Sequence, residues 1–339
     1  MTSPLLEVRH LRVEFPTRRG TLTAIDDVSF EIAPGEVLGV VGESGAGKSM
    51  TGNAIIGLLE PPGRIAGGEI LLEGRRIDNL PAEAMRKLRG RRIGAIFQDP
   101  LTSLNPLFRI GDQLVETIRT HLPLDAAAAR SRAIELLRDV GISAPERRID
   151  HYPHQFSGGM RQRVVIALAL CAEPKLVIAD EPTTALDVSI QAQIIALLKR
   201  LTREHGTAVM LVTHDMGVIA ETADRVAVMY AGRLAEIGPV QRVIHDPQHP
   251  YTAGLMGSIP AVGSELERLP QIEGSMPRLD AIPMGCAFNP RCPRAFDRCR
   301  VERPPLLQAN GTLAACWLHA PERKAALAGP DWSEGAVHG

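Results

Sequence analysis

Short runs in which hydrophobic and polar positions alternate dominate the N-terminal part of the chain. The runs are LRVEF, LTAI and VSFEI, and the turn-like segment TRRG interrupts them. An alternation with a period of two is typical of strands that bury one face, and polar segments with glycine are typical of the turns between strands. The pattern predicts a small antiparallel β layer.

Farther along, the hydrophobic runs are continuous, and helix-like stretches separate them. The runs are VLGVVG at residues 37–42, LVIAD at 176–180 and AVMLVTH at 208–214, and RVAVMY and RLAEIG predict a closing hairpin around Ala231 and Gly232. Helical spacing of apolar residues follows the first run and also covers 190–201. Continuous apolar strands that alternate with helices indicate a parallel sheet covered on both faces. The expected fold class is α/β.

From about residue 100 to residue 157, apolar residues recur at helical spacing, and the strand-like runs are replaced. Asp125 is a candidate N-cap, and Ala133, Leu136 and Leu137 follow at helical spacing before Gly141 ends the pattern. Asp favours helix N-termini, and Gly favours C-termini. We expect a helical subdomain here.

Composition and charge disfavour several classes of protein function. The chain has 38 basic and 39 acidic side chains and a net charge of −1, so no global field favours nucleic acid as a partner. The longest apolar run, at residues 164–172, is much shorter than the roughly 20 residues that a membrane-spanning helix needs. Glu7, Arg9 and Arg12 interrupt the N-terminus before an apolar stretch reaches the length of a secretion signal. We expect a cytosolic protein.

The segment GESGAGKS lies between a predicted buried strand and a predicted helix, and it fits the GxxxxGKS phosphate-loop pattern. Glycines let backbone N–H groups close around phosphate oxygens, and the helix N-terminus adds partial positive charge. We expect Lys48 to reach the β and γ phosphates of ATP and the Ser49 hydroxyl to bind Mg²⁺. A flexible turn with a surface lysine is the alternative. The candidate nucleotide-binding residues are Gly42, Glu43, Ser44, Gly45, Ala46, Gly47, Lys48, Ser49 and Met50.

Two carboxylates end the apolar run LVIAD. Asp180 and Glu181 lie at the carboxyl edge of the predicted sheet, where ligands of doubly wound folds bind. Adjacent strand residues point apart, so their roles differ. We expect Asp180 to join the Mg²⁺ shell and Glu181 to orient the attacking water. A solvated acidic pair that caps the next helix is the alternative.

A second candidate anion site precedes the apolar run VVIALAL. Ser157, Gly158 and Gly159 expose N–H groups at a predicted helix N-terminus. With GESGAGKS before it and ADEPTTALD after it, this segment resembles the ATP-binding subunits of ABC transporters over residues 5–240. That family combines a RecA-like parallel sheet, an antiparallel β subdomain and a helical subdomain. The resemblance implies one ATPase domain at 1–240 and an extension at 241–339.

The resemblance also implies roles for single residues. Gln98 matches the glutamine that contacts Mg²⁺ and senses the membrane partner, and His214 matches the switch histidine that holds the γ-phosphate. Asp187 matches the residue that meets the opposite subunit. Phe15 is a candidate for adenine stacking and equally for the core. Met160 departs from the usual glutamine, which removes one side-chain donor.

The family implies that the chain works in an assembly at the cytoplasmic face of the inner membrane. In a head-to-tail dimer, Ser157 and Gly159 of one subunit would close over ATP held by Lys48 of the other. Nucleotide-driven closure would pass near Gln98 to two membrane-spanning permease subunits. The expected dimer mate is a second, related ABC ATPase.

Four of the five cysteines lie near the end of the chain, at Cys286, Cys292, Cys299 and Cys316, and Cys171 lies apart in an apolar helical run. Reduced cytosolic thiols favour a metal site over disulfides, and the spacing does not choose between zinc and an iron–sulfur cluster. With HPYTAGLMGSIP, this segment resembles the extension of oligopeptide and dipeptide importer ATPases. The resemblance implies a [4Fe–4S] cluster, and zinc stays as the alternative.

The predicted function is ATP hydrolysis that drives uptake of dipeptides or oligopeptides, delivered by an extracytoplasmic peptide-binding protein. A nickel importer shares much of the ATPase sequence, but the cysteine-containing extension favours peptides. A soluble ABC ATPase acting on nucleic acid would commonly carry two cassettes or a basic coiled-coil insertion, and neither is evident in the sequence.

Overall fold

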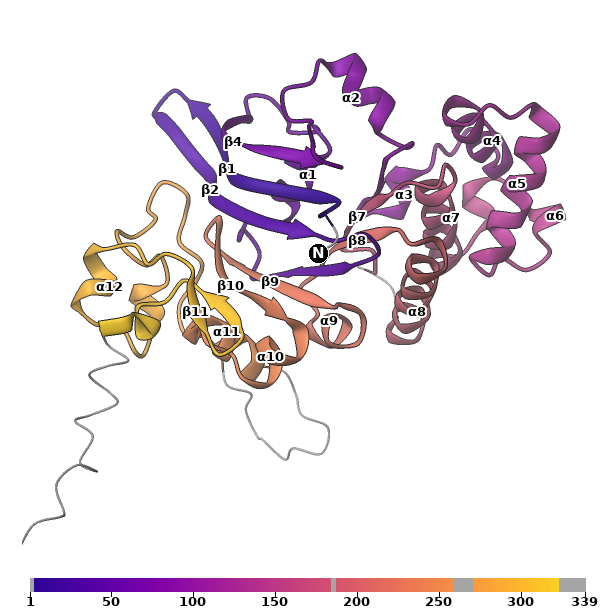
Figure 1. Cartoon of the computed structure of the whole chain (residues 1–339). Helices are drawn as coiled ribbons and strands as arrows, with labels where there is room; N and C mark the ends of the chain where they lie inside the picture. Colours follow the sequence, from indigo (N-terminus) through magenta and orange to yellow (C-terminus); the bar gives the residue numbers. More distant parts are fainter. Residues whose placement is uncertain (1–2, 184–186, 259–270, 323–339) are drawn as a thin grey trace, which may run out of the picture.

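Two β-sheets organise the chain (Figure 1). The computed structural model describes residues 3–183, 187–258 and 271–322. Among these residues, none of the helices combines the length and the apolar character that a membrane crossing needs.

The smaller sheet is antiparallel and lies in the N-terminal part of the chain. Leu6 pairs with Ile32 on one side and with Leu72 on the other, and its side chain is fully buried. The predicted antiparallel layer is confirmed, and LTAI and VSFEI lie in one continuous strand. The strands, in spatial order, are β2 (Gly20–Ile32), β1 (Leu6–Thr17), β4 (Arg64–Leu72) and β5 (Arg75–Arg76).

The larger sheet has a parallel centre, as the continuous apolar runs predict. The parallel strands, in spatial order, are β9 (Arg225–Tyr230), β3 (Val37–Val41), β8 (Ala208–Val212), β7 (Leu176–Asp180) and β6 (Ile93–Ile96). Strand β10 (Arg233–Pro239) pairs antiparallel with β9 and forms the predicted hairpin. The carboxyl ends of β3, β7 and β8 therefore meet at one edge of the sheet.

Both faces of the larger sheet are covered. Val37 and Val41 belong to a hydrophobic cluster built largely with helices, and Leu38 and Val40 belong to a cluster shared with the smaller sheet. Because side chains alternate across a strand, these clusters lie on opposite faces. Helices outside the helical subdomain and the C-terminal part are α1 (Lys48–Ile55), α2 (Ala82–Leu88), α8 (Val188–His205) and α9 (Met216–Thr222).

The predicted helical subdomain is present and projects to one side of the sheets (Figure 1). Asp125 accepts a hydrogen bond from the N–H of Ala128 at 2.8 Å, so the predicted N-cap is confirmed. The helices are α3 (Pro100–Ser103), α4 (Ile110–His121), α5 (Ala126–Asp139), α6 (Pro145–Arg148), the 3-10 helix η1 (Pro153–Gln155) and α7 (Gly158–Leu170).

We call residues 3–240 the cassette and the later described residues, 241–258 and 271–322, the extension. The extension continues the larger sheet, because Ala314 pairs with Glu236 of β10 and Leu313 pairs with Ile237. Its elements are α10 (Val240–His245), whose first residue belongs to the cassette, α11 (Pro250–Gly257), η2 (Asn289–Arg291), α12 (Asp297–Val301), β11 (Leu307–Ala309), β12 (Thr312–Ala314) and η3 (Trp317–His319).

Candidate functional site

The phosphate loop connects the end of β3 to the start of α1. Gly47 has φ of 103°, and a β-carbon there would lie 2.6 Å from Cδ1 of Ile25. A β-carbon on Gly42 would lie 2.3 Å from the carbonyl oxygen of Met229. Both positions therefore require glycine, which explains the spacing of the motif. Ser44, Gly45 and Ser49 are exposed, so this side of the loop is open to a ligand.

Lys48 lies inside the loop and is only 7% exposed. Its ammonium donates hydrogen bonds to the carbonyl oxygens of Gly42 and Glu43, at 2.8 and 3.1 Å. Burial lowers the pKa of Lys48, and the nearby carboxylates of Glu181, Asp180 and Glu43 oppose that shift. A phosphate group would therefore supply negative charge to a partly desolvated ammonium.

Asp180 and Ser49 contact each other at the end of β7. The Ser49 hydroxyl donates to Oδ1 of Asp180 at 2.9 Å. Burial raises the pKa of Asp180, and the hydrogen bond from Ser49 opposes that shift. A divalent cation would replace this hydrogen bond with two oxygen ligands and favour the ionised carboxylate, so the donor pair fits Mg²⁺.

Glu181 brings the other predicted catalytic residues together. Its carboxylate accepts a hydrogen bond from Nε2 of Gln98 at 3.1 Å, and Nδ1 of His214 lies 3.3 Å from its second oxygen. Glu181 has φ of 46°, which is uncommon for a residue with a β-carbon. Strained backbone of this kind clusters at functional sites. The three side chains come from the ends of neighbouring strands beside the phosphate loop.

The second candidate anion site lies at the N-terminus of α7, and Asp187, the predicted contact to the opposite subunit, lies at the N-terminus of α8. Ser157 caps α7 and accepts from the N–H of Met160 at 3.4 Å, and Asp187 caps α8 and accepts from the N–H of Ile190 at 2.9 Å. A β-carbon on Gly159 would lie 2.8 Å from Ile190. Ser157, Gly158 and Asp187 are exposed. This group is therefore a surface and not an enclosed cavity.

Phe15 and Met50 lie at the edge of the cluster shared between the two sheets, and both are half-buried. A β-carbon on Gly63 would lie 2.7 Å from the Phe15 ring. Packing accounts for these positions, and adenine stacking by Phe15 stays a prediction.

Glu43 lies in the loop but contacts the extension. Its N–H donates to the Tyr251 hydroxyl at 2.9 Å, and its carboxylate accepts from Arg291 at 3.0 and 3.1 Å. Sequence reasoning missed both partners, because each lies more than 200 positions away in the chain. The nearest sequence signal is the surplus of arginines among the cysteines.

The four C-terminal cysteines line one small cavity, with a volume of about 10 Å³. Burial raises the pKa of Cys286 to about 11 and that of Cys316 to about 12. Among the residues that the structure describes, no group of three or more His, Cys, Asp or Glu side chains is arranged to hold a metal ion. The positions of these side chains therefore do not show the predicted iron–sulfur or zinc site. Cys171 is buried in the core of the cassette, as expected.

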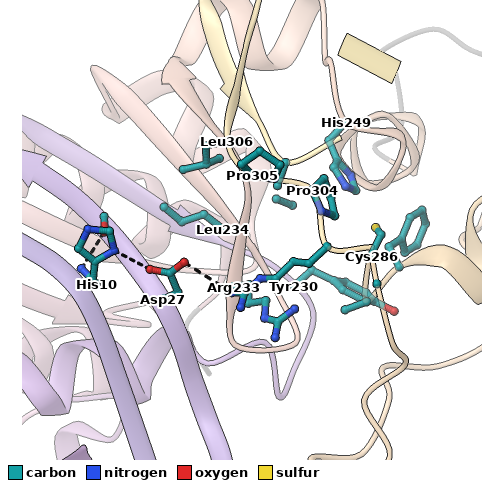
Figure 2. Close-up of a pocket in the computed structure, with 17 residues that line it drawn as sticks. His10, Asp27, Tyr230, Arg233, Leu234, His249, Cys286, Pro304, Pro305 and Leu306 are labelled. Carbon is teal, nitrogen blue, oxygen red and sulfur yellow. Dashed lines mark hydrogen bonds and ion pairs between the residues drawn. The ribbon is translucent and has the colours of Figure 1, made fainter. Parts of the chain in front are cut away.

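A larger cavity, about 420 Å³, lies between the smaller sheet and the extension. Figure 2 shows His10 and Asp27 on one side of it and His249 and Cys286 on the other. Neither the phosphate loop nor Glu181 lines it. A recess of about 10 Å³ lies beside Ser49 and Asp180. With Ser44, Gly45 and Ser49 exposed, the candidate nucleotide site in this single chain is an open surface.

Comparisons with known proteins agree with this geometry. Residues 25–184 match the family described as ABC transporter, and residues 235–299 match the oligopeptide/dipeptide transporter C-terminal region. The oligopeptide transport ATP-binding protein OppD of Haemophilus influenzae is 47% identical over 94% of this chain and 98% of its own length. AppD of Bacillus subtilis is 46% identical over 94% of this chain and 98% of its own.

A solved structure shows the same fold. The ATP-binding cassette MJ0796, described as a dimer bound to ADP and phosphate after hydrolysis, matches with a TM-score of 0.63 and 29% identity. The match covers 69% of this chain and 98% of that one. The phosphate loop, the acidic pair at the sheet edge, the capped SGG helix and the matched extension all lead to one assignment: this chain belongs to the ABC transporter ATPases, in the group of oligopeptide and dipeptide transport ATP-binding proteins.

Proposed function

We propose that this chain hydrolyses ATP to drive the uptake of oligopeptides or dipeptides through a membrane transporter. The observation that carries the proposal is the gathering of Gln98, Glu181 and His214 beside the phosphate loop. Water attack on a phosphate needs a carboxylate that orients the water and donors that stabilise the charge, and this group supplies both. The matched C-terminal region and the printed names of the relatives support peptides as the cargo.

The residues divide the chemistry between them. Loop N–H groups and Lys48 hold the phosphates, and Ser49 and Asp180, with Gln98, hold Mg²⁺, which neutralises phosphate charge when bound. Glu181 orients and polarises the attacking water, and His214 holds the γ-phosphate. The hydrogen bond between Gln98 and Glu181 links the metal side of the site to the water side.

A complete site requires a second ATPase. The exposed N-terminus of α7 at Ser157 and Gly158 can bind an anion but has no phosphate loop of its own, and the loop with Lys48 is open on the side of Ser44 and Ser49. Two open half-sites on facing subunits can enclose one nucleotide, and the dimeric state of the related cassette MJ0796 supports this arrangement. We infer that the mate is a related second ATPase, so the pair is a heterodimer.

Membrane-spanning subunits would dock next to Gln98. Leu107 and Phe108 are 80% and 54% exposed, and Phe97 beside Gln98 is 42% exposed. All three lie on or just after the segment that contains Gln98, and exposed large apolar side chains can mark a partner surface. We infer two permease subunits, an extracytoplasmic peptide-binding protein, and a peripheral position at the cytoplasmic face of the inner membrane.

We further propose that the four-cysteine cavity takes a [4Fe–4S] cluster, with zinc as the alternative. Four thiols facing one cavity support this proposal, although they would have to approach one another to act as ligands. Iron and acid-labile sulfide measured in anaerobically purified protein test it. One equivalent of zinc without sulfide would support the alternative, and protein without either metal would refute both.

Lys48→Ala tests the proposed function. Because the loop loses its ammonium, we expect binding of MgATP to fall by about a hundredfold and peptide uptake into proteoliposomes to stop. Lys87→Ala is the matched control, since Lys87 is an exposed lysine on α2, and it should leave both unchanged. If Lys48→Ala binds MgATP as tightly as the wild type does, the proposed nucleotide site is wrong. If the transporter takes up nickel in an ATP-dependent way and does not take up peptides, the proposed cargo is wrong.

A further inference from the structure

We propose that Arg291 is a positioning residue for the nucleotide site: through Glu43 it holds the phosphate loop from the side of the extension and sets the affinity for MgATP. The inference rests on the proposed function, because it assigns the loop to ATP. Nothing in the ATPase motifs assigns a role to this arginine.

The contact between Arg291 and Glu43 is geometrically well defined. Nη1 of Arg291 donates to both carboxylate oxygens of Glu43, at 3.0 and 3.1 Å. The Arg291 side chain is 8% exposed and that of Glu43 is 28% exposed, so water screens the pair less than it screens a surface ion pair. The pair therefore fixes the position of Glu43.

Arg291 is itself held rigidly. Nε donates to the carbonyl oxygen of Glu273 at 2.8 Å, and Nη2 donates to that of Ile272 at 3.3 Å. The Tyr230 hydroxyl lies 3.3 Å from Nη1, and the guanidinium carbon lies 5.8 Å and 5.9 Å from the ring centroids of Tyr230 and Phe288. Because so many groups fix the guanidinium plane, the arginine presents one orientation to Glu43.

Tyr251 supplies a second contact from the extension. Its hydroxyl accepts the Glu43 N–H at 2.9 Å, and its ring is fully buried against Tyr230 and Phe288, with centroids 4.7 and 5.4 Å apart. The extension thus holds both the backbone and the side chain of Glu43. This amide is engaged, so Glu43 contributes position and not a phosphate ligand.

Glu43 passes this constraint to the loop. Its carbonyl oxygen accepts from Lys48 Nζ at 3.1 Å and from the N–H of Ala46 at 3.1 Å. A shift of Glu43 therefore moves an acceptor of the phosphate-binding lysine. If the loop loses this constraint, ATP must order it on binding, which raises the Kd.

A double-mutant cycle on the assembled transporter tests the inference. The variants are Arg291→Ala, Glu43→Gln and the two combined, with MgATP Kd and the KM and kcat of hydrolysis measured for each. We expect Arg291→Ala to raise Kd and KM about tenfold and to leave kcat within about twofold, because the catalytic groups are untouched. Glu43→Gln should have a similar effect, and the combination should add little.

Two further variants separate positioning from folding. Arg291→Lys keeps the charge and much of the packing but loses the two-oxygen contact, so it should raise Kd by about threefold. Arg300→Ala, an exposed arginine of the same extension, should bind as the wild type does. If Arg291→Ala does not fold, Glu43→Gln and Arg291→Lys still decide the question.

The outcomes distinguish this inference from the proposed function. If Lys48→Ala loses MgATP and both Glu43→Gln and Arg291→Lys bind as the wild type does, the inference is wrong and the ATP site stands. Fully additive effects of Arg291→Ala and Glu43→Gln would also overturn it, because they would show that Arg291 acts on the fold and not through Glu43. If Lys48→Ala binds normally, the proposed function fails.

Discussion

The cassette and the extension differ in how much hydrophobic core each builds from its own residues. Two large hydrophobic clusters lie one on each face of the parallel sheet, and the cassette supplies most of their residues. In the extension, two small clusters consist of Cys299, Trp317 and Ala320, and of Ala309, Ala314 and Cys316. The extension also contributes Val243, Tyr251, Ala287 and Phe288 to the large cluster on the helix-covered face, and its Arg303 pairs with Asp26 of the smaller sheet. Because the described part of the extension builds only small clusters of its own, we expect the loss of a buried polar contact to cost the extension more than the loss of a surface cap costs the cassette.

Two arginines of the cysteine segment also support the extension. Arg291 pairs with Glu43, and Arg298 pairs with Glu302 and lies 3.5 Å from the Trp317 ring centroid. These two side chains join the extension to the cassette and to itself.

Loss of the catalytic carboxylate should have the largest effect. In Glu181→Gln the contact to Gln98 can persist, but the water loses its base, so we expect hydrolysis to fall about a thousandfold with MgATP binding retained. Phosphate release by the assembled transporter is the measurement. Glu204→Gln, an exposed glutamate on α8, is the control. Unchanged turnover in Glu181→Gln would refute the role of this residue.

Removal of a buried carboxylate should release the extension. Glu236 is fully buried and accepts from the N–H groups of Gln248 and His249 and from the Thr312 hydroxyl. Because Glu236→Ala leaves these donors without an acceptor, we expect a loss of about 3 kcal/mol in the free energy of unfolding. Glu236→Gln keeps one acceptor oxygen and should lose less.

Urea unfolding followed by tryptophan fluorescence measures this loss, because both tryptophans, Trp317 and Trp332, lie in the C-terminal part of the sequence. Equal stability of Glu236→Ala and the wild type would show that the extension does not depend on this network.

Acid should weaken the extension through His249. Burial, with a smaller effect of His319, lowers the pKa of His249 to about 4, from 6.5. Its Nδ1 accepts the Tyr251 N–H at 3.0 Å, which requires that nitrogen to be unprotonated. Below pH 6.5 the His249 ring binds a proton in the unfolded chain, whereas in the folded chain it does so only below about pH 4. The free energy of unfolding therefore decreases as the pH is lowered from 6.5 to about 4.

We expect a loss of about 2 kcal/mol in unfolding free energy between pH 7 and pH 5 from this residue alone. His249→Asn keeps a cap acceptor without a titrating ring, so its unfolding free energy should change less over that range. Identical pH profiles for the two proteins would contradict the assignment.

Loss of a polar contact in the cassette should lower the free energy of unfolding least. Asp125→Ala removes the N-cap of α5, but Ala133, Leu137 and Val140 remain buried in the large cluster, so we expect a loss of about 1 kcal/mol. Urea unfolding measures this loss. A larger loss than in Glu236→Ala would reverse the comparison between the two regions.

Local sequence patterns predict the cassette well, because its strands, the N-cap of α5 and the phosphate loop depend on neighbouring residues. Local patterns do not predict strand β4, because Gly67 and Gly68 interrupt its alternation of apolar and polar residues. The contact between Glu43 and Arg291 joins residues that are 248 positions apart, and no local pattern specifies such a pair. Likewise, cysteine spacing reveals a cluster of thiols but not whether they approach closely enough to bind a metal.

Hydrogen exchange of the phosphate loop without nucleotide tests the central claim most directly, namely that the extension orders a loop that the cassette supplies. We predict that the amides of residues 43–47 exchange faster in Arg291→Ala than in the wild type, and that Arg300→Ala exchanges as the wild type does. Equal exchange at these amides in Arg291→Ala and the wild type would contradict the account.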